Sequence, residues 1–191
     1  MHLKGDVNLK RIFFALLFVL LFPVLVFSED SKVTFSPSDT QLQGQPAVIC
    51  ETSFYRIKLP QEWNYTPNYY KDTMIALTGF SPDYHLNITV GLYTKPLSKI
   101  ESDEFDKNYN ILIDEIKNTP QVTIKEIKNV LLPNTNCKRL IIFVPSKSLY
   151  TVMYIINKEN YPFSINFLSY PSEYESKLPL FDEIVSTLEF K

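Results

Sequence analysis

Glycine and histidine are scarce in this chain of 191 residues, which contains 4 glycines and 2 histidines. Beyond residue 28 the glycines are Gly44, Gly79 and Gly91, far apart from one another. Because a loop that cradles a phosphate needs closely spaced glycines, the sequence excludes a loop of that kind. His85 is the single histidine beyond residue 28, and the chain has no G-x-S-x-G turn for a nucleophilic serine. We therefore expect His85 to be an ordinary surface residue and not part of a Ser-His-Asp hydrolase site.

Cysteine is scarce as well, with Cys50 and Cys137 as the 2 cysteines of the chain. These residues and His85 lie far apart and include no close pair such as C-x-x-C, so no metal site is predicted. Three carboxylates within residues 103–106 are close enough to act together in acid–base catalysis. Their place in the first turn of a predicted helix explains them better, because carboxylates there stabilise the helix dipole. The sequence thus predicts no catalytic residue, no cofactor and no enzyme activity.

Concentrated positive charge is also missing. The chain has 19 Lys and Arg against 21 Asp and Glu, a formal net charge of −2, and both signs are scattered along it. Nucleic-acid-binding proteins concentrate Lys and Arg on one face, and an anionic membrane surface selects a similar basic cluster. We therefore expect no nucleic-acid partner, and no strong membrane binding once the N-terminal segment has been removed.

The N-terminal segment has the features of a secretory signal peptide. Basic residues up to Arg11 give it a positive start, and the apolar run that follows ends at Phe27. That run is shorter than the roughly 20 residues that a membrane-spanning helix needs. Ser28 is a small residue at which a signal peptidase can cleave, so residues 1–28 are predicted to be a signal peptide. The protein is then exported, either periplasmic or secreted; an uncleaved segment that anchors the chain in a membrane is the alternative.

Residues 29–45 are polar and show no sustained periodicity, so they are predicted to form a flexible leader before a folded domain at 46–191. The organising segment of that domain is Phe54–Tyr65. Apolar and polar residues alternate there up to Pro60, which is the pattern of a strand with one buried face. Pro60 ends the strand because proline has no N–H for the ladder. Trp63, the single tryptophan of the chain, is then predicted to be buried against the edge of the sheet.

Alternating or apolar segments predict further strands, and the last two are apolar on both faces and therefore central. The strands are expected at residues 47–51, 74–80, 86–92, 122–132, 139–144, 149–157 and 163–168. Residues 61–73 are predicted to be an aromatic loop. An apolar stripe at helical spacing from Phe105 to Ile116 predicts a helix that opens at Ser98 or Ser102. A second helix is expected from about Pro179, after a loose turn at residues 172–177, because proline interrupts a continuous helix.

Three segments resemble the Mog/PsbP-like family. They are LPQEW at 59–63, the start of the helix at Ser98–Phe105 and FDEIVSTLEF at 181–190. The resemblance extends over Pro46 to Lys191 and implies an α+β fold, an α/β/α sandwich on a single, mainly antiparallel β-sheet of about 6–7 strands with two main helices. Family members are binding and accessory proteins, such as thylakoid-lumen partners of photosystem II, a Ran-binding nuclear-transport factor and bacterial envelope proteins of the DcrB type. None of the three segments is a catalytic motif, so the resemblance supports a fold and no specific activity.

Two functions are expected from these observations. The first is an exported, non-enzymatic binding or accessory domain whose partner is a protein or a cell-envelope component. Its candidate surface consists of aromatic side chains, which supply rigid contact area, although several of them could instead pack as lids over the core. These residues are Trp63, Tyr65, Tyr69, Tyr70, Tyr84 and Tyr93. The second is a carrier of a hydrophobic ligand or lipid, with a pocket between the sheet and the helix Phe105–Ile116.

Cys50 and Cys137 are candidates for a disulfide, because an even number of cysteines in an exported chain permits one. The resemblance to the family's sheet implies that the strands following these cysteines lie side by side, which would bring the two sulfur atoms together. Two buried free thiols are the alternative.

Overall fold

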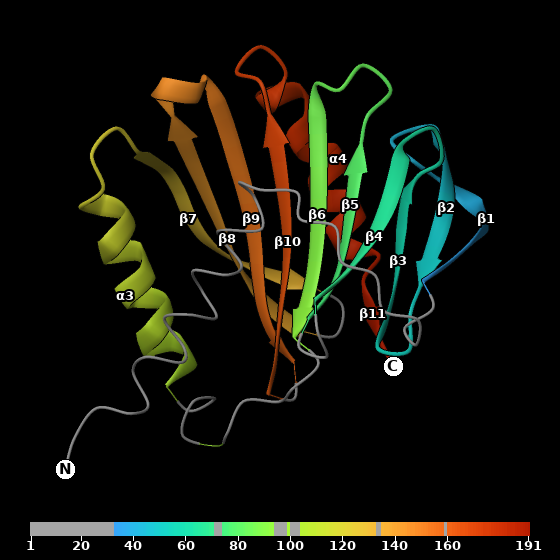
Figure 1. Cartoon of the computed structure of the whole chain (residues 1–191), viewed down its shortest axis with the longest axis horizontal. Helices are drawn as coiled ribbons and strands as arrows, with labels where there is room; N and C mark the ends of the chain where they lie inside the picture. Colours follow the sequence, from blue (N-terminus) through green and yellow to red (C-terminus); the bar gives the residue numbers. More distant parts are fainter. Residues whose placement is uncertain (1–32, 71–73, 94–98, 100–103, 133–134, 159) are drawn as a thin grey trace.

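The strands of this protein form two antiparallel sheets, with helices α3 and α4 on opposite faces of the larger one (Figure 1). The computed structural model describes residues 33–70, 74–93, 99, 104–132, 135–158 and 160–191. The smaller sheet has the strand order β1-β2-β3-β11, and the larger one has the order β4-β5-β6-β10-β9-β8-β7. The strands are β1 (Thr34–Leu42), β2 (Gln45–Glu51), β3 (Tyr55–Pro60), β4 (Asn64–Tyr70), β5 (Met74–Phe80), β6 (Leu86–Tyr93), β7 (Thr123–Leu132), β8 (Thr135–Val144), β9 (Leu149–Lys158), β10 (Tyr161–Ser169) and β11 (Glu189–Phe190). The helices are α3 (Phe105–Lys117) and α4 (Tyr174–Ser186), with a turn of 3-10 helix, η1, at Pro145–Lys147.

The larger sheet carries a hydrophobic core on each face, because its inner strands are apolar on both sides. On one face, the apolar stripe of α3 packs onto β8 and β9, where Leu140 and Met153 meet it. On the other face, α4 and the smaller sheet share a larger core that includes Ile165 and Phe181. β9 and β10 are interior strands, as the sequence predicted. The structure thus confirms the α+β fold with antiparallel pairing and two main helices.

The prediction of a single sheet is wrong, and the turn after β3 explains why there are two. β3, the predicted organising strand, ends at Pro60 and pairs with β2 and β11 in the smaller sheet. Trp63 follows in the turn and is buried as predicted, with 7% of its surface exposed. β4 begins directly after it and belongs to the larger sheet. Because Pro60 stops the pairing and Trp63 fixes the turn in the core, the chain passes there from one sheet to the other.

Two segments predicted to be irregular are edge strands. Residues 34–42 form β1 and pair with β2, so the prediction of a flexible leader over 29–45 is wrong for these residues. Residues 64–70, in the predicted aromatic loop, form β4 and pair with β5. The strands contain Pro37 and Pro67, which an edge strand tolerates because one side of its backbone has no ladder partner. β1 is also exposed along most of its length, so it lacks the alternation that would reveal a strand.

α4 is a continuous helix from Tyr174 to Ser186, although Pro179 lies inside it. The predicted break before Pro179 is therefore wrong. Proline removes one intrahelical hydrogen bond, but the burial of Phe181 and Ile184 against the larger sheet holds both halves of the helix in place. The predicted start of α3 at Ser98 or Ser102 lies outside the described residues, and so does the predicted signal peptide.

Cys50 and Cys137 are free and buried, so the structure does not contain the predicted disulfide. Cys50 belongs to β2 in the smaller sheet, and Cys137 belongs to β8 in the larger one. The strands expected to lie side by side are therefore in different sheets. Burial raises the pKa of the Cys50 thiol to about 12 and that of Cys137 to about 11, which keeps both protonated at neutral pH.

An ionic cluster centred on the buried Arg139 joins α4 to the larger sheet. Arg139 on β8 is only 5% exposed, and its guanidinium lies 2.5 Å from Asp182 on α4 and 2.7 Å from Glu126 on β7. The Tyr154 hydroxyl on β9 also donates to Asp182, at 2.5 Å. Burial lowers the pKa of Arg139, but the hydrogen bonds to the carboxylates outweigh it and raise that pKa overall, so the guanidinium stays charged.

Within the described residues, no helix is long and apolar enough to cross a membrane.

Candidate functional site

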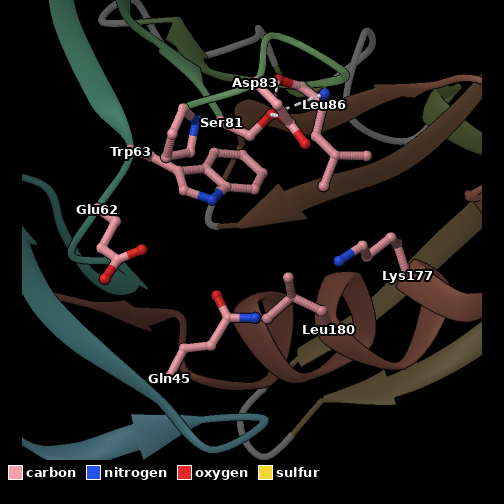
Figure 2. Close-up of a pocket in the computed structure, with 9 residues that line it drawn as sticks. Gln45, Glu62, Trp63, Ser81, Asp83, Leu86, Lys177 and Leu180 are labelled. Atoms are coloured by element: carbon pink, nitrogen blue, oxygen red, sulfur yellow. Dashed lines mark hydrogen bonds between the residues drawn. The ribbon is translucent and has the colours of Figure 1, made fainter.

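A pocket of about 180 Å³ opens where the turn between β5 and β6 approaches α4 (Figure 2). Figure 2 shows Trp63 and Ser81 on one side of the pocket and Lys177 and Leu180, from α4, on the other. Sequence segments far apart thus supply its walls. The full set of lining residues is Gln45, Glu62, Trp63, Ser81, Pro82, Asp83, Leu86, Lys177 and Leu180.

Both apolar and charged side chains line the pocket. Trp63, Leu86 and Leu180 are buried residues of the main core. Glu62 and Asp83 add two negative charges and Lys177 adds one positive charge. Drug-sized ligands and cofactors occupy pockets of about 300–1,000 Å³. This pocket is smaller, so it suits one inserted side chain or a small polar molecule better than a lipid.

The turn between β5 and β6 is held by a dense set of hydrogen bonds. Three of them join Ser81 and Leu86. The Ser81 N–H donates to the Leu86 carbonyl and the Leu86 N–H donates to Ser81 Oγ, both at 3.0 Å, and the Ser81 hydroxyl also reaches the Leu86 carbonyl at 3.4 Å. Asp83 Oδ1 accepts from Ser81 Oγ at 2.5 Å and from the His85 N–H at 3.1 Å. The hydrogen bond from Ser81 and the one from His85 hold the pKa of the Asp83 carboxyl below its usual value. Tyr84 lies between these residues with φ +60°.

His85 connects this turn to the start of α4. Its Nδ1 atom lies 2.6 Å from Glu173 Oε1 and 3.7 Å from Asp83 Oδ2. The ring of Tyr170 meets the imidazole edge-on, with centroids 5.4 Å apart. Sequence reasoning treated His85 as an ordinary surface residue and missed Glu173. These two residues are 88 positions apart, so no spacing in the sequence relates them.

The structure divides the predicted aromatic surface into a buried and an exposed part. Trp63 belongs to the core, and Tyr65 is partly buried, with its hydroxyl donating to the Pro60 carbonyl at 2.7 Å. Tyr84 is 69% exposed, and its ring lies 6.0 Å from that of Phe80. The burial alternative therefore holds for Trp63 and Tyr65, and Tyr84 remains as a surface residue.

For the other three residues of the predicted aromatic surface, the structure describes the position of the backbone only. Tyr69 and Tyr70 are the last residues of β4, and Tyr93 is the last residue of β6. In the register of the larger sheet, Met74 of β5 lies between Tyr70 and Tyr93. The three tyrosines are thus on two strands, β4 and β6, at the same end of the sheet with β5 between them. Their side chains lie outside the described part of the structure.

The region between α3 and the sheet, where the sequence suggested a ligand pocket, is packed by side chains. Phe105, Tyr109 and Ile113 of α3 are buried in one cluster with Leu140 and Met153 of the sheet. The pocket of Figure 2 lies on the other face of the larger sheet, which α4 covers. Among the described residues, the contact between α3 and the sheet is therefore a packed core.

The chain matches no protein-family model and no curated protein sequence. Among solved structures, it is similar to the cyanobacterial PsbP (CyanoP) of Synechocystis sp. PCC 6803, with 9% identity, a TM-score of 0.52, and coverage of 89% of this chain and 100% of the other. It is also similar to LpqN of Mycobacterium tuberculosis, described as involved in cell envelope biogenesis, with 12% identity, 85% and 93% coverage and a TM-score of 0.49. A third is the immunity protein TplEi of the Pseudomonas aeruginosa T6SS, with 9% identity, 100% and 86% coverage and a TM-score of 0.44. The match across the whole cyanobacterial protein agrees with the strand and helix pattern predicted from LPQEW and FDEIVSTLEF, and this chain has a PsbP-like fold.

Proposed function

We propose that this protein is an exported, non-enzymatic accessory domain that binds a protein or cell-envelope component through the turn between β5 and β6. The observation that carries the proposal is the exposed pair of Phe80 and Tyr84 beside the pocket. Aromatic side chains of this kind are enriched at the centre of protein interfaces, because they bury a large area with few rotatable bonds. A partner side chain of modest size fits the adjoining pocket.

The backbone of Tyr84 supports this assignment. Its φ of +60° lies in the left-handed region, which is uncommon for a residue with a large side chain. Such conformations are maintained when surrounding structure fixes them, and they are enriched at functional sites. Here the hydrogen bonds of Ser81 and Asp83 fix the turn, and the Tyr84 ring points away from the core. A turn that is held rigidly while it presents an aromatic ring to solvent is suited to binding a partner without rearrangement.

Quantitative affinity capture from the native envelope tests the proposal with two matched variants. Tyr84→Asn removes the ring and keeps the turn, because Asn tolerates a positive φ. Leu131→Asn makes the same kind of change on β7, at the opposite edge of the larger sheet, where Leu131 is 83% exposed. A specific partner should be captured by the wild type and by Leu131→Asn and be lost with Tyr84→Asn. Equal recovery with all three baits would refute the turn as the binding surface.

Export forms part of the same proposal, since residues 1–28 have the charge and apolar pattern of a signal peptide. The mature chain should begin at or near Glu29. N-terminal sequencing of secreted or periplasmic material tests this, and recovery of intact residues 1–28 in a membrane fraction would instead favour the N-terminal anchor.

A further inference from the structure

We propose that Asp83, His85 and Glu173 form a binding site for a divalent transition metal ion of the Zn²⁺ type. Each residue offers one ligand atom, and these atoms all lie within 4.8 Å of one another. Two of the ligands come from the turn between β5 and β6, and the third comes from the residue that precedes α4. The metal would therefore join two parts of the chain that are already in contact.

The distances fit a tetrahedral ion after a small adjustment. Ligand atoms at about 2.0–2.1 Å from zinc, with tetrahedral angles, are about 3.3 Å apart. His85 Nδ1 lies 3.7 Å from Asp83 Oδ2, which is close to that value, and 2.6 Å from Glu173 Oε1. The second pair is now a direct hydrogen bond. A metal ion would replace the shared proton, and the Glu173 side chain would have to move away from His85 and toward Asp83, because the three ligand atoms now lie up to 4.8 Å apart.

Surrounding residues hold the ligands in the orientation that a metal requires. Asp83 Oδ1 is occupied by Ser81 Oγ and by the His85 N–H, which leaves Oδ2 directed toward the imidazole. The edge of the Tyr170 ring restricts rotation of the His85 ring. Contacts of this kind around metal ligands fix their orientation and typically change metal affinity 10–100-fold when they are removed.

The ligand set also indicates the type of metal. Mg²⁺ and Ca²⁺ prefer oxygen ligands alone, whereas an imidazole nitrogen with two carboxylates suits zinc and its neighbours in the first transition row. Three protein ligands leave a fourth position open, as in zinc sites that bind water or an exchangeable group. Asp83 and the His85 ring are exposed, so this position faces solvent beside Tyr84.

Titration with zinc chloride, read out by competition with a chromogenic chelator at neutral pH, tests the site. We expect one zinc ion per chain in the wild type and at least a tenfold loss of affinity in His85→Gln and in Glu173→Gln. Glu175→Gln makes the same change in charge at an exposed position of α4 and should bind as the wild type does. Thermal unfolding without metal shows whether each variant remains folded.

A second measurement locates the ion. Zinc should shift the imidazole ¹⁵N resonances of His85, which are identified by their loss in His85→Gln. The proposal is overturned if the wild type does not bind zinc at about 1 mM, or if Glu173→Gln binds it as tightly as the wild type. It is also overturned if zinc binds without changing the His85 resonances. Tyr84→Asn should keep wild-type zinc affinity, so failure of the metal site and failure of the proposed binding surface are distinguishable.

Discussion

Four residues form the ionic cluster: Arg139, Asp182, Glu126 and Tyr154. Replacing different members should destabilise the protein by different amounts, because the members differ in exposure. The Arg139 side chain is 6% exposed, whereas Asp182 and Glu126 are 43% and 35% exposed. Removing the arginine leaves two carboxylates that water can reach. Removing Asp182 leaves a buried guanidinium with only Glu126 and takes the acceptor from the buried Tyr154 hydroxyl.

The magnitudes follow from these environments. Asp182→Ala should destabilise the protein by about 3–5 kcal/mol, the usual cost of leaving a buried charge with part of its partners removed. Arg139→Met keeps much of the buried aliphatic volume and should cost about 1–2 kcal/mol, the net value of the hydrogen bonds it loses. Tyr154→Phe removes only the hydroxyl and should cost about 1 kcal/mol. In the double variant of Arg139 and Asp182, the cost should be smaller than the sum of the two single costs, because the unpaired guanidinium is gone.

Urea unfolding followed by circular dichroism and by Trp63 fluorescence measures these free energies, provided that the slopes with urea agree among the variants. The reasoning is refuted if Arg139→Met costs as much as Asp182→Ala or more. Such a result would mean that hydration of the two carboxylates does not offset the loss of their guanidinium partner, despite their exposure. Strict additivity in the double variant would show that Arg139 and Asp182 do not stabilise each other.

Four further predictions concern the core. Trp63→Ala should cost about 3 kcal/mol, at the lower end of the range for Trp and Phe truncations because the adjoining pocket lets water enter; an unchanged urea midpoint would show that the ring contributes nothing to the core. Gly79→Ala should cost about 1–3 kcal/mol by overpacking, since its Cβ would lie 2.5 Å from the Tyr65 ring; wild-type stability by thermal unfolding would contradict this close contact. Without reductant, Cys50 and Cys137 should resist alkylation in the native protein, and both should react in urea. If neither reacts in urea, the two cysteines form a disulfide after all. Because their folded pKa values of about 12 and 11 exceed that of an unfolded cysteine, stability should fall as the pH rises from about 8.5 toward those values, which pH-dependent urea midpoints can measure.

Elements with at least one buried face could be predicted from the sequence, whereas an exposed strand could not. β6 alternates apolar and polar residues because Ile88 and Val90 face the core, and α3 shows its stripe because one side of it is buried. β1 has almost no buried residue, so nothing in its composition separates it from a flexible leader. In α4, tertiary packing outweighs the local effect of Pro179, which a rule based on one residue cannot anticipate.

Only the part of the candidate site formed by one continuous segment of sequence was predictable. The segment from Ser81 to His85 lies between two predicted strands and contains Pro82 and Asp83, which are residue types typical of turns. Its contact with Glu173 depends on how α4 lies across the larger sheet, and the sequence carries no local signal for that. The aromatic surface was overestimated for a related reason. Exposed and buried tyrosines have the same sequence signature, and it is the position of β4 beside the small sheet that buries part of Tyr65.

The strand order of the two sheets determines when the newly synthesised chain can fold. β10 pairs with β6 on one side and β9 on the other, and β11, at residues 189–190, pairs with β3. The larger sheet is complete only when β10 has been made and the smaller one only when β11 has been made, and pairings between such distant segments form slowly. The late arrival of β10 and β11 leaves the edges of β6, β9 and β3 unpaired during synthesis, and such edges can aggregate until their partner strands arrive.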